Sequence, residues 1–169
     1  MNLVEVYHAS IFRIEKPLWD RGRSNLDFGK GFYLTDIYDQ ALVWALRKGR
    51  ENNTPPIINS YIFNKREVLE KARCLIFETY DNEWLDFIVS CRSGGDIWKQ
   101  YDYIEGGVAD DRVIDTVNLY IQGFISAERA IDNLKYFRPN NQICINNQEI
   151  LDSYLKFQEE LKLPENELL

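Results

Sequence analysis

The sequence predicts an α+β domain, and two of its features lead to that class. Strand-like and helix-like segments follow one another without the regular strand–helix–strand rhythm of a doubly wound sheet. The glycine-rich motifs of the common nucleotide-binding folds, G-x-G-x-x-G and G-x-x-x-x-G-K-[ST], do not occur in the 169 residues. This length suits one domain, which we expect to span residues 1–163, with a frayed C-terminal tail over residues 164–169.

In the N-terminal part we expect two strands separated by a loop, followed by a helix. Leu3–Tyr7 is a short apolar-rich run of strand type, and Gly31–Leu34 is the second such run. Proline and glycine residues punctuate residues 11–30, which predicts a loop. The helix should begin at Thr35 or Asp36, since both are good N-caps, and should end in the polar stretch before two prolines.

The remaining elements are predicted from the same signals. Runs of β-branched and aromatic residues predict strands, whereas apolar residues at helical spacing predict helices. The predicted strands are Ile57–Phe63, Leu75–Phe77, Tyr101–Val108 and Gln142–Ile145. The predicted helices are Asp81–Cys91, Arg112–Ile121, Ala127–Leu134 with Ser126 as its cap, and a last helix that buries Ile150, Leu151, Tyr154 and Leu155 behind a capping box of Asn146 and Glu149.

Composition excludes several classes of protein. The formal net charge of -7 repels phosphate backbones, so we expect no non-specific nucleic-acid binding. Three widely spaced cysteines without a C-x-x-C pair favour a reducing compartment, and a single histidine excludes a multi-histidine metal site, so we expect no metal. The N-terminus is unlike a signal peptide and no apolar run is long enough to span a bilayer, which predicts a soluble, cytoplasmic protein.

Three segments hold the candidate site residues. The first is Tyr7-His8-Ala9-Ser10, which follows the first strand. The second covers residues 25–35 and reads Asn-Leu-Asp-Phe-Gly-Lys-Gly-Phe-Tyr-Leu-Thr, with glycines that permit close backbone approach to a ligand. The third is Asn141-Gln142-Ile143-Cys144-Ile145 at a late strand. Basic residues also gather between Arg13 and Lys30, which suits a small anionic ligand.

These segments resemble the ADP-ribosyltransferase superfamily, especially its poly(ADP-ribose) polymerase branch. That branch carries a His-Gly-Ser/Thr context after its first strand, here His8-Ala9-Ser10, and a Gly-x-Gly-x-Tyr-Phe-Ala segment, here residues 29–35. Its third motif position is often glutamate and is matched here by Gln142, so the variant reads histidine, tyrosine, glutamine. The chain resembles more closely an uncharacterised bacterial family that shares Asp-Phe-Gly-x-Gly-Phe-Tyr-Leu-Thr and a later Gly-x-Val-Ala-Asp-Asp, here residues 106–111.

The resemblance runs over most of the chain and implies a fold and an activity. The implied fold is an ADP-ribosyltransferase-like split β-sheet core with flanking helices. The implied activity is that of a mono-ADP-ribosyltransferase, an enzyme of the glycosyltransferase class that uses NAD as co-substrate to modify a macromolecular target. From resemblance alone, we expect a bacterial toxin of a toxin–antitoxin pair or an anti-phage effector, with a small antitoxin as a possible partner protein.

The chemistry of NAD suggests what these residues do. Nicotinamide is already a cationic leaving group, so the site needs no general acid, but it must stabilise positive charge on the ribose. We expect His8 to bond a ribose hydroxyl, Tyr33 to stack on the nicotinamide, and both side chains to converge on one cleft. By resemblance, the backbone beside His8 binds the nicotinamide amide. The expected NAD-binding residues are His8, Ala9, Ser10, Arg23, Asn25, Asp27, Phe28, Gly29, Gly31, Phe32 and Tyr33.

Gln142 is the departure that matters for catalysis. A carboxylate about 4 Å from the developing cation would contribute roughly 4 kcal/mol at an effective dielectric near 20, and an uncharged amide does not. Three outcomes follow: a slow enzyme that transfers one unit, another carboxylate such as Asp110 or Asp111 in that role, or a catalytically inactive NAD/ADP-ribose-binding module. If Gln142 faces the ribose, Gln142→Glu should raise NAD hydrolysis.

Structural roles compete with each of these assignments. Asp110 and Asp111 precede a predicted helix, where they can serve as caps instead. His8 can be a structural hydrogen bonder, and the motif as a whole can belong to an unrelated α+β interaction domain. The candidate catalytic set is therefore His8, Tyr33, Gln142, Asp110 and Asp111.

Overall fold

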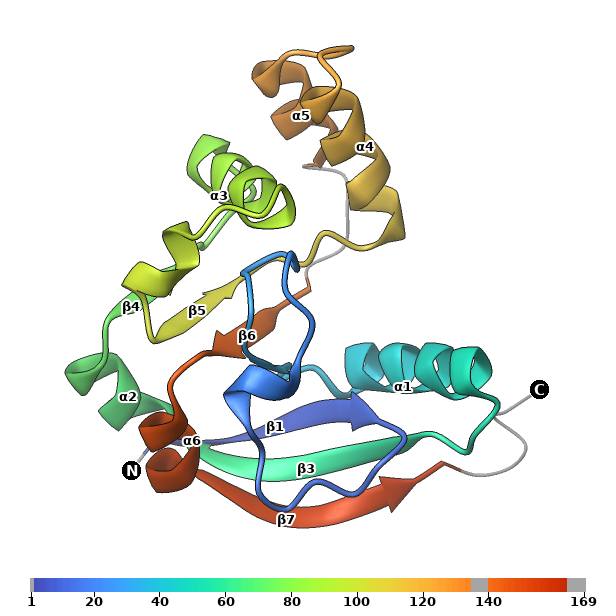
Figure 1. Cartoon of the computed structure of the whole chain (residues 1–169), viewed down its shortest axis with the longest axis vertical. Helices are drawn as coiled ribbons and strands as arrows, with labels where there is room; N and C mark the ends of the chain where they lie inside the picture. The colour runs from blue at the N-terminus through green and yellow to red at the C-terminus, as the bar shows by residue number, and fades with distance from the viewer. Residues whose placement is uncertain (1, 135–139, 164–169) are drawn as a thin grey trace.

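A computed structural model describes residues 2–134 and 140–163, and it confirms the α+β class (Figure 1). Within these residues, six α-helices accompany two sheets. The first sheet has the order β1-β3-β7 and is antiparallel throughout. Its strands are β1 (Leu3–Ser10), β3 (Ile57–Asn64) and β7 (Leu155–Lys162).

The second sheet has the order β2-β6-β5-β4, and only its β4–β5 pair is parallel. Its strands are β2 (Phe32–Leu34), β6 (Gln142–Ile145), β5 (Tyr103–Gly106) and β4 (Cys74–Ile76). The two sheets meet where Tyr7 of β1 and Thr35 after β2 form an isolated antiparallel bridge, with N–O distances of 2.8 and 3.0 Å.

The helices cover the sheets and place the connecting loops. They are α1 (Tyr38–Asn52), α2 (Lys65–Lys71), α3 (Asn82–Arg92), α4 (Asp111–Ile121), α5 (Ala127–Leu134) and α6 (Gln148–Tyr154). Two short 3-10 turns, Trp19–Arg21 and Ile97–Gln100, interrupt the loops. No helix in the described part of the chain has the length and apolar character required to cross a membrane.

Local sequence explains where several helices begin. The Asp81 carboxylate accepts the Trp84 N–H at 2.8 Å and starts α3, and the Ser126 hydroxyl accepts the Arg129 N–H at 3.2 Å and starts α5. Asn64 caps α2 in the same way, by accepting the Glu67 N–H. These helices thus begin at residues whose side chains replace the missing intrahelical acceptors.

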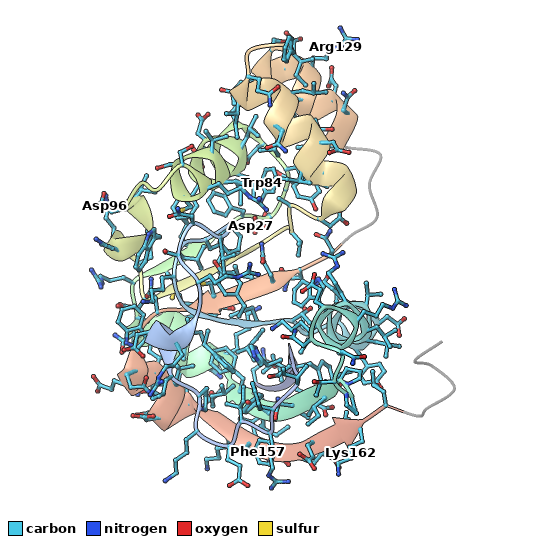
Figure 2. The ribbon with its side chains drawn as sticks, turned by 45° about the vertical axis from the view of Figure 1, so that its right-hand side comes forward. Asp27, Trp84, Asp96, Arg129, Phe157 and Lys162 are labelled. Atoms are coloured by element: carbon cyan, nitrogen blue, oxygen red, sulfur yellow. The ribbon has the colours of Figure 1, made fainter. Side chains whose placement is uncertain are left out.

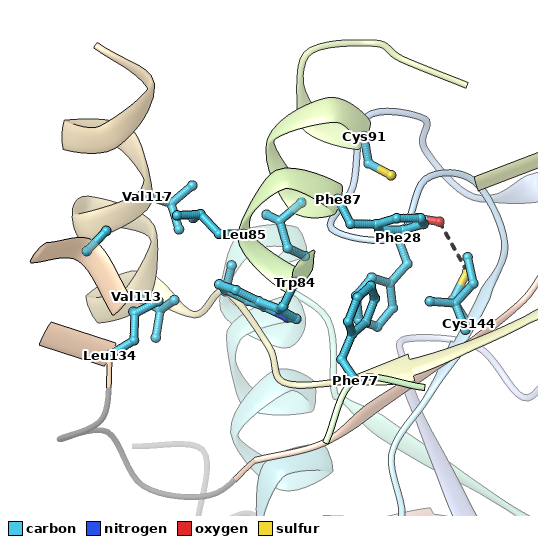
Figure 3. Packing of buried hydrophobic residues seen from close by; sticks show 14 residues of the cluster. Phe28, Phe77, Trp84, Leu85, Phe87, Cys91, Val113, Val117, Leu134 and Cys144 are labelled. Carbon is cyan, nitrogen blue, oxygen red and sulfur yellow. Dashed lines mark hydrogen bonds between the residues drawn. The ribbon is translucent and has the colours of Figure 1, made fainter. Parts of the chain in front are cut away.

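The core consists of three clusters, one for each pair of facing layers. One cluster lies between the second sheet and α3, α4 and α5, with Phe28 and Trp84 at its centre (Figure 3). Another joins the two sheets through Phe32, Phe63 and Tyr103. The smallest lies under α1, where Ala9 and Ala45 meet. Sheet faces therefore differ: Phe32 points to the space between the sheets, and the neighbouring Tyr33 points to the helices.

Four predictions were wrong at the ends of β1, α1 and α6 and at the end of the chain, and the predicted strand Tyr101–Val108 covers only Tyr103–Gly106. β1 continues to Ser10, so His8 and Ala9 belong to the strand. α1 begins after Ile37 without a side-chain cap, because Thr35 is paired with Tyr7 and its hydroxyl accepts the Ile37 N–H. The cap of α6 is Asn147 and not Asn146.

The fourth error concerns the end of the chain. The last helix ends at Tyr154, and Leu155 begins β7, which was not predicted. The strand carries mostly polar residues, and it pairs along the whole of β3, so the partner strand determines its conformation more than its own composition does. The short helix α2 was also not predicted. The expected frayed tail over 164–169 lies outside the described residues.

Candidate functional site

The candidate site is a break in strand pairing between β1 and β2, which we call the opening, next to the isolated bridge that joins the two sheets. Beyond the Tyr7–Thr35 pair the same antiparallel register would place Ala9 opposite Tyr33, but among the described residues the strands form no further bridge there. Tyr7 uses its N–H and C=O toward Thr35, so two residues later the Ala9 N–H and C=O also point away from β3, toward β2. The opening is therefore edged by the Ala9 backbone.

His8 reaches across this opening to the backbone of Tyr33. Its Nδ1 lies 2.7 Å from the Tyr33 carbonyl oxygen, and its ring stacks on Phe32 with the centroids 4.2 Å apart. A carbonyl oxygen only accepts, so Nδ1 carries the proton and Nε2 keeps its lone pair in the neutral ring. Burial, followed by the positive charge of Lys48, lowers the pKa of His8 to about 3, so the ring is neutral at physiological pH.

The Tyr33 hydroxyl stabilises the glycine-containing loop through two hydrogen bonds. It donates to the Gly29 carbonyl oxygen at 2.6 Å and accepts the Phe28 N–H at 3.0 Å. The ring lies on the opposite face of β2 from Phe32 and His8. His8 therefore contacts the backbone of Tyr33, but the two side chains lie on opposite faces of β2, so the expected convergence of both side chains on one cleft is wrong.

The two glycines of the motif are required by contacts inside the protein. Gly29 has a φ of +75°, and a side chain there would collide with the Trp98 ring. A side chain at Gly31 would collide with the Cys144 sulfur. Trp98 and Cys144 are thus the groups that approach these glycines closely. The two glycines allow the loop to adopt the conformation that the Tyr33 hydroxyl stabilises.

Two cationic side chains lie beside the opening. Lys48, on the face of α1 that packs on β1, donates from Nζ to the Ala9 carbonyl oxygen at 2.7 Å. Burial and the nearby positive charge of Arg23 lower the pKa of Lys48. Arg23 was among the predicted NAD-binding residues, and Lys48 was not. A signal was available, because Lys48 follows Ala41 and Ala45 at helical spacing and so lies on the buried face of α1.

Asp27 and Gln142 belong to a second region, a hydrogen-bonded network that we call the Asp27 network. Asp27 is 5% exposed, and Oδ1 accepts from Arg92 Nε at 2.8 Å while Oδ2 accepts from the Ala109 N–H at 2.8 Å. The Gln142 amide donates to the same Oδ2 at 2.9 Å and to the Gly107 carbonyl oxygen at 3.3 Å. Asp27 is labelled in Figure 2. Every partner of Asp27 named here belongs to the protein itself.

Asp110, at the start of α4, fills the capping role that competed with catalysis. Asp110 Oδ1 accepts the Val113 N–H at 3.1 Å, as an N-cap does. The side chain of Asp111 lies outside those that the structure describes. Sequence reasoning missed Arg92, the ionic partner of Asp27, because the two are 65 residues apart and no local pattern links them.

The other predicted NAD-binding residues occupy three kinds of position. Ser10 ends β1, where its hydroxyl accepts the Phe12 N–H at 3.1 Å. Asn25 adopts a φ of 62° in the loop. Phe28 and Phe32 are core residues on either side of β2. Of the predicted set, His8, Ala9 and Tyr33 border the opening, and Arg23 lies near enough to Lys48 for its charge to lower the pKa of that residue. Among the described residues, no group of three or more His, Cys, Asp or Glu side chains could hold a metal ion.

Comparison with known proteins identifies the family of the chain. Residues 4–157 match the family described as "Protein of unknown function (DUF3990)", so the chain belongs to that family. No curated protein and no solved structure matches it. The matched range includes both the opening and the Asp27 network.

Proposed function

We propose that this member of the DUF3990 family binds NAD at the opening between β1 and β2 and transfers ADP-ribose from it to a macromolecular acceptor. The observation that carries the proposal is the set of groups gathered there: an Ala9 backbone directed toward β2, a His8 ring with Nε2 as acceptor, and the Lys48 ammonium with the positive charge of Arg23 acting on it. Its resemblance to the His-Tyr-Gln pattern supports the same reading. The toxin role and the antitoxin partner rest on that resemblance alone.

The Ala9 backbone suits the carboxamide of nicotinamide. A primary amide has one carbonyl acceptor and one NH2 donor, which match a peptide N–H and C=O on the same strand edge. The Ala9 C=O already accepts from Lys48, and a carbonyl oxygen has two lone pairs, so it can accept a second donor. This pairing would fix the orientation of the nicotinamide ring at the β1 edge.

His8 and the cations suit the remaining parts of the dinucleotide. Because Nδ1–H is held by the Tyr33 carbonyl, the free Nε2 can accept a hydrogen bond from a ribose hydroxyl. Lys48 and Arg23 provide positive charge for the pyrophosphate on a body of formal net charge -7. A local cationic site on an acidic protein favours a small anion over a long polyanion.

In the transfer reaction the bond between nicotinamide and the ribose C1 breaks, and nicotinamide leaves with the electron pair as a neutral molecule. An acceptor nucleophile forms the new bond to C1 and loses a proton. The chain would hold and orient the substrate, which can account for much of the rate enhancement. Charge stabilisation is weaker: Gln142 is neutral and the Asp27 carboxylate is paired with Arg92. We therefore propose a slow transferase that adds one unit.

The test uses labelled NAD in a cell extract, with wild type, Tyr33→Ala and Phe124→Ala compared. Phe124 is 73% exposed on the α4–α5 turn and provides an aromatic control remote from β1 and β2. Label should be transferred by wild type and by Phe124→Ala but not by Tyr33→Ala. Equal transfer by all three proteins would show that the assigned site is wrong.

A second candidate function, an NAD- or ADP-ribose-binding module without turnover, is favoured by one observation. The Gln142 amide is bonded to Asp27 and Gly107, and no free carboxylate takes its place among these contacts. Nicotinamide release from NAD separates the two functions. A protein that binds NAD in calorimetry but releases no nicotinamide would be a binding module.

A further inference from the structure

A large groove is lined in part by Asp36 and Ile37, which directly follow the bridge residue Thr35. It has a volume of about 1030 Å³ and is bordered by α2, the β4–α3 connection, α5 and the residues that follow β2. Four carboxylates line it, namely Asp36, Glu78, Asp81 and Glu105. Among the described residues that line it, Lys65 is the one lysine or arginine. We call this feature the acidic groove.

The positive charge of Lys65 is neutralised by an ion pair inside the groove. Its Nζ lies 2.7 Å from Glu105 Oε1, and Glu105 is only 7% exposed. The other oxygen of Glu105 accepts the Tyr103 hydroxyl at 2.6 Å, and Asn141 Nδ2 donates to Oε1 at 2.9 Å. This ion pair is internally neutral, so among the described lining residues the exposed carboxylates of Asp36, Glu78 and Asp81 give the groove its negative charge.

The walls of the acidic groove are partly apolar. Leu69 of α2 is 38% exposed and Ile76 of β4 is 44% exposed, and Ile131 of α5 lies on the lining as well. A groove of this size exceeds a single side chain and can take a short stretch of polypeptide. We expect the occupant to carry positive charge, which complements the carboxylates, and apolar side chains, which complement the walls. The negative charge of the carboxylates repels polyanions such as RNA.

The acidic groove adjoins Gln142 of the Asp27 network. Asn141 lines the groove and directly precedes Gln142 in the chain. Gly107 also lines it, and the Gly107 carbonyl oxygen accepts from Gln142 Nε2. On the opposite side, Gln40 of α1 exchanges two hydrogen bonds with the Asn141 backbone, at 2.6 and 3.1 Å. A segment held in the groove would therefore lie next to Gln142.

We propose that the acidic groove binds the acceptor, and that this acceptor is a basic protein segment in which arginine or lysine alternates with apolar residues. This inference rests on the proposed transferase function, but binding of the segment needs no NAD. An experiment can therefore disprove peptide binding in the groove without disproving the transferase function, and the reverse.

The experiment measures fluorescence anisotropy of a labelled peptide of alternating arginine and leucine, titrated with the full-length protein without NAD. Glu78→Arg is the test variant, since Glu78 is exposed in the groove and its replacement should not disturb folding. Glu159→Arg is the control, because Glu159 is exposed on β7 and the change in net charge is the same. We expect Glu78→Arg to weaken peptide binding on the order of tenfold and Glu159→Arg by less than about twofold.

Two results would overturn the proposal. Equal affinities of the two variants would mean that the peptide responds to net charge and not to the groove. Binding of a single-stranded RNA of the same length as tightly as the peptide would mean that the wrong class of macromolecule was assigned. Nicotinamide release and NAD binding, measured in parallel on the same variants, report on the transferase function and should be unaffected by Glu78→Arg.

Discussion

The opening and the Asp27 network both contain residues of the predicted site, but their polar groups are used differently. In the Asp27 network, each named contact of Asp27 is with another part of the protein: Arg92, the Ala109 N–H and Gln142. At the opening, His8 uses only one ring nitrogen internally, and the Ala9 N–H is directed away from its sheet. The difference separates residues that fold the loop from residues that can bind a ligand.

The largest expected effect is in the Asp27 network. Asp27→Ala removes the carboxylate that pairs with Arg92, and it leaves the Ala109 N–H and the Gln142 amide without an acceptor. Breaking a buried pair costs about 3 kcal/mol or more, and the free energy of unfolding in urea should fall by that amount. Asp20→Ala is the control, since Asp20 is exposed. A decrease in the free energy of unfolding of less than about 1 kcal/mol would contradict the structural role that we assign to Asp27.

The next largest effect is expected for Gln142→Glu, which also changes the Asp27 network. The substitution places a carboxylate where an amide now donates to Asp27 Oδ2 at 2.9 Å, so two like charges would meet in a buried site. We expect a loss of about 2 kcal/mol at pH 7 that becomes smaller in acid, as one carboxyl takes up a proton. Gln158→Glu makes the same chemical change at an exposed position. Faster nicotinamide release by a stable Gln142→Glu protein would instead assign this position to the ribose.

A smaller effect is expected in the pH dependence of stability, to which His8 contributes. The pKa of His8 is about 3 in the folded protein and about 6.5 when unfolded, so between these values the unfolded chain binds more protons. Stability contributed by the neutral ring is present above pH 6.5 and is lost as the pH falls. From pH 7 to pH 5 the loss is about 2 kcal/mol. His8→Asn keeps a donor for Tyr33 and should lack this loss, as urea titrations at both pH values would detect. An identical pH dependence in both proteins would contradict a buried neutral ring.

Sequence reasoning predicted the elements whose signals are local. The bounds of β6 and α5 were predicted correctly, because turn residues and caps flank a short apolar strand and an amphipathic helix. It did not predict β7, whose polar sequence becomes a strand only against β3. The roles of Gly29 and Gly31 could not be predicted either, since Trp98 and Cys144 approach them from distant parts of the chain. Local patterns located the candidate site, whereas non-local contacts determine which of its residues are structural.

The most direct test of the account is NAD binding by Ala9→Pro. Proline removes the N–H that faces the opening, and it removes no bond to β3, because the Ala9 N–H points away from that strand. Ala9→Gly keeps the N–H and serves as the control. In calorimetric titrations we expect wild type and Ala9→Gly to bind NAD with similar affinity, and folded Ala9→Pro to bind at least about tenfold more weakly. Equal affinity of all three folded proteins would contradict the placement of nicotinamide at the Ala9 backbone.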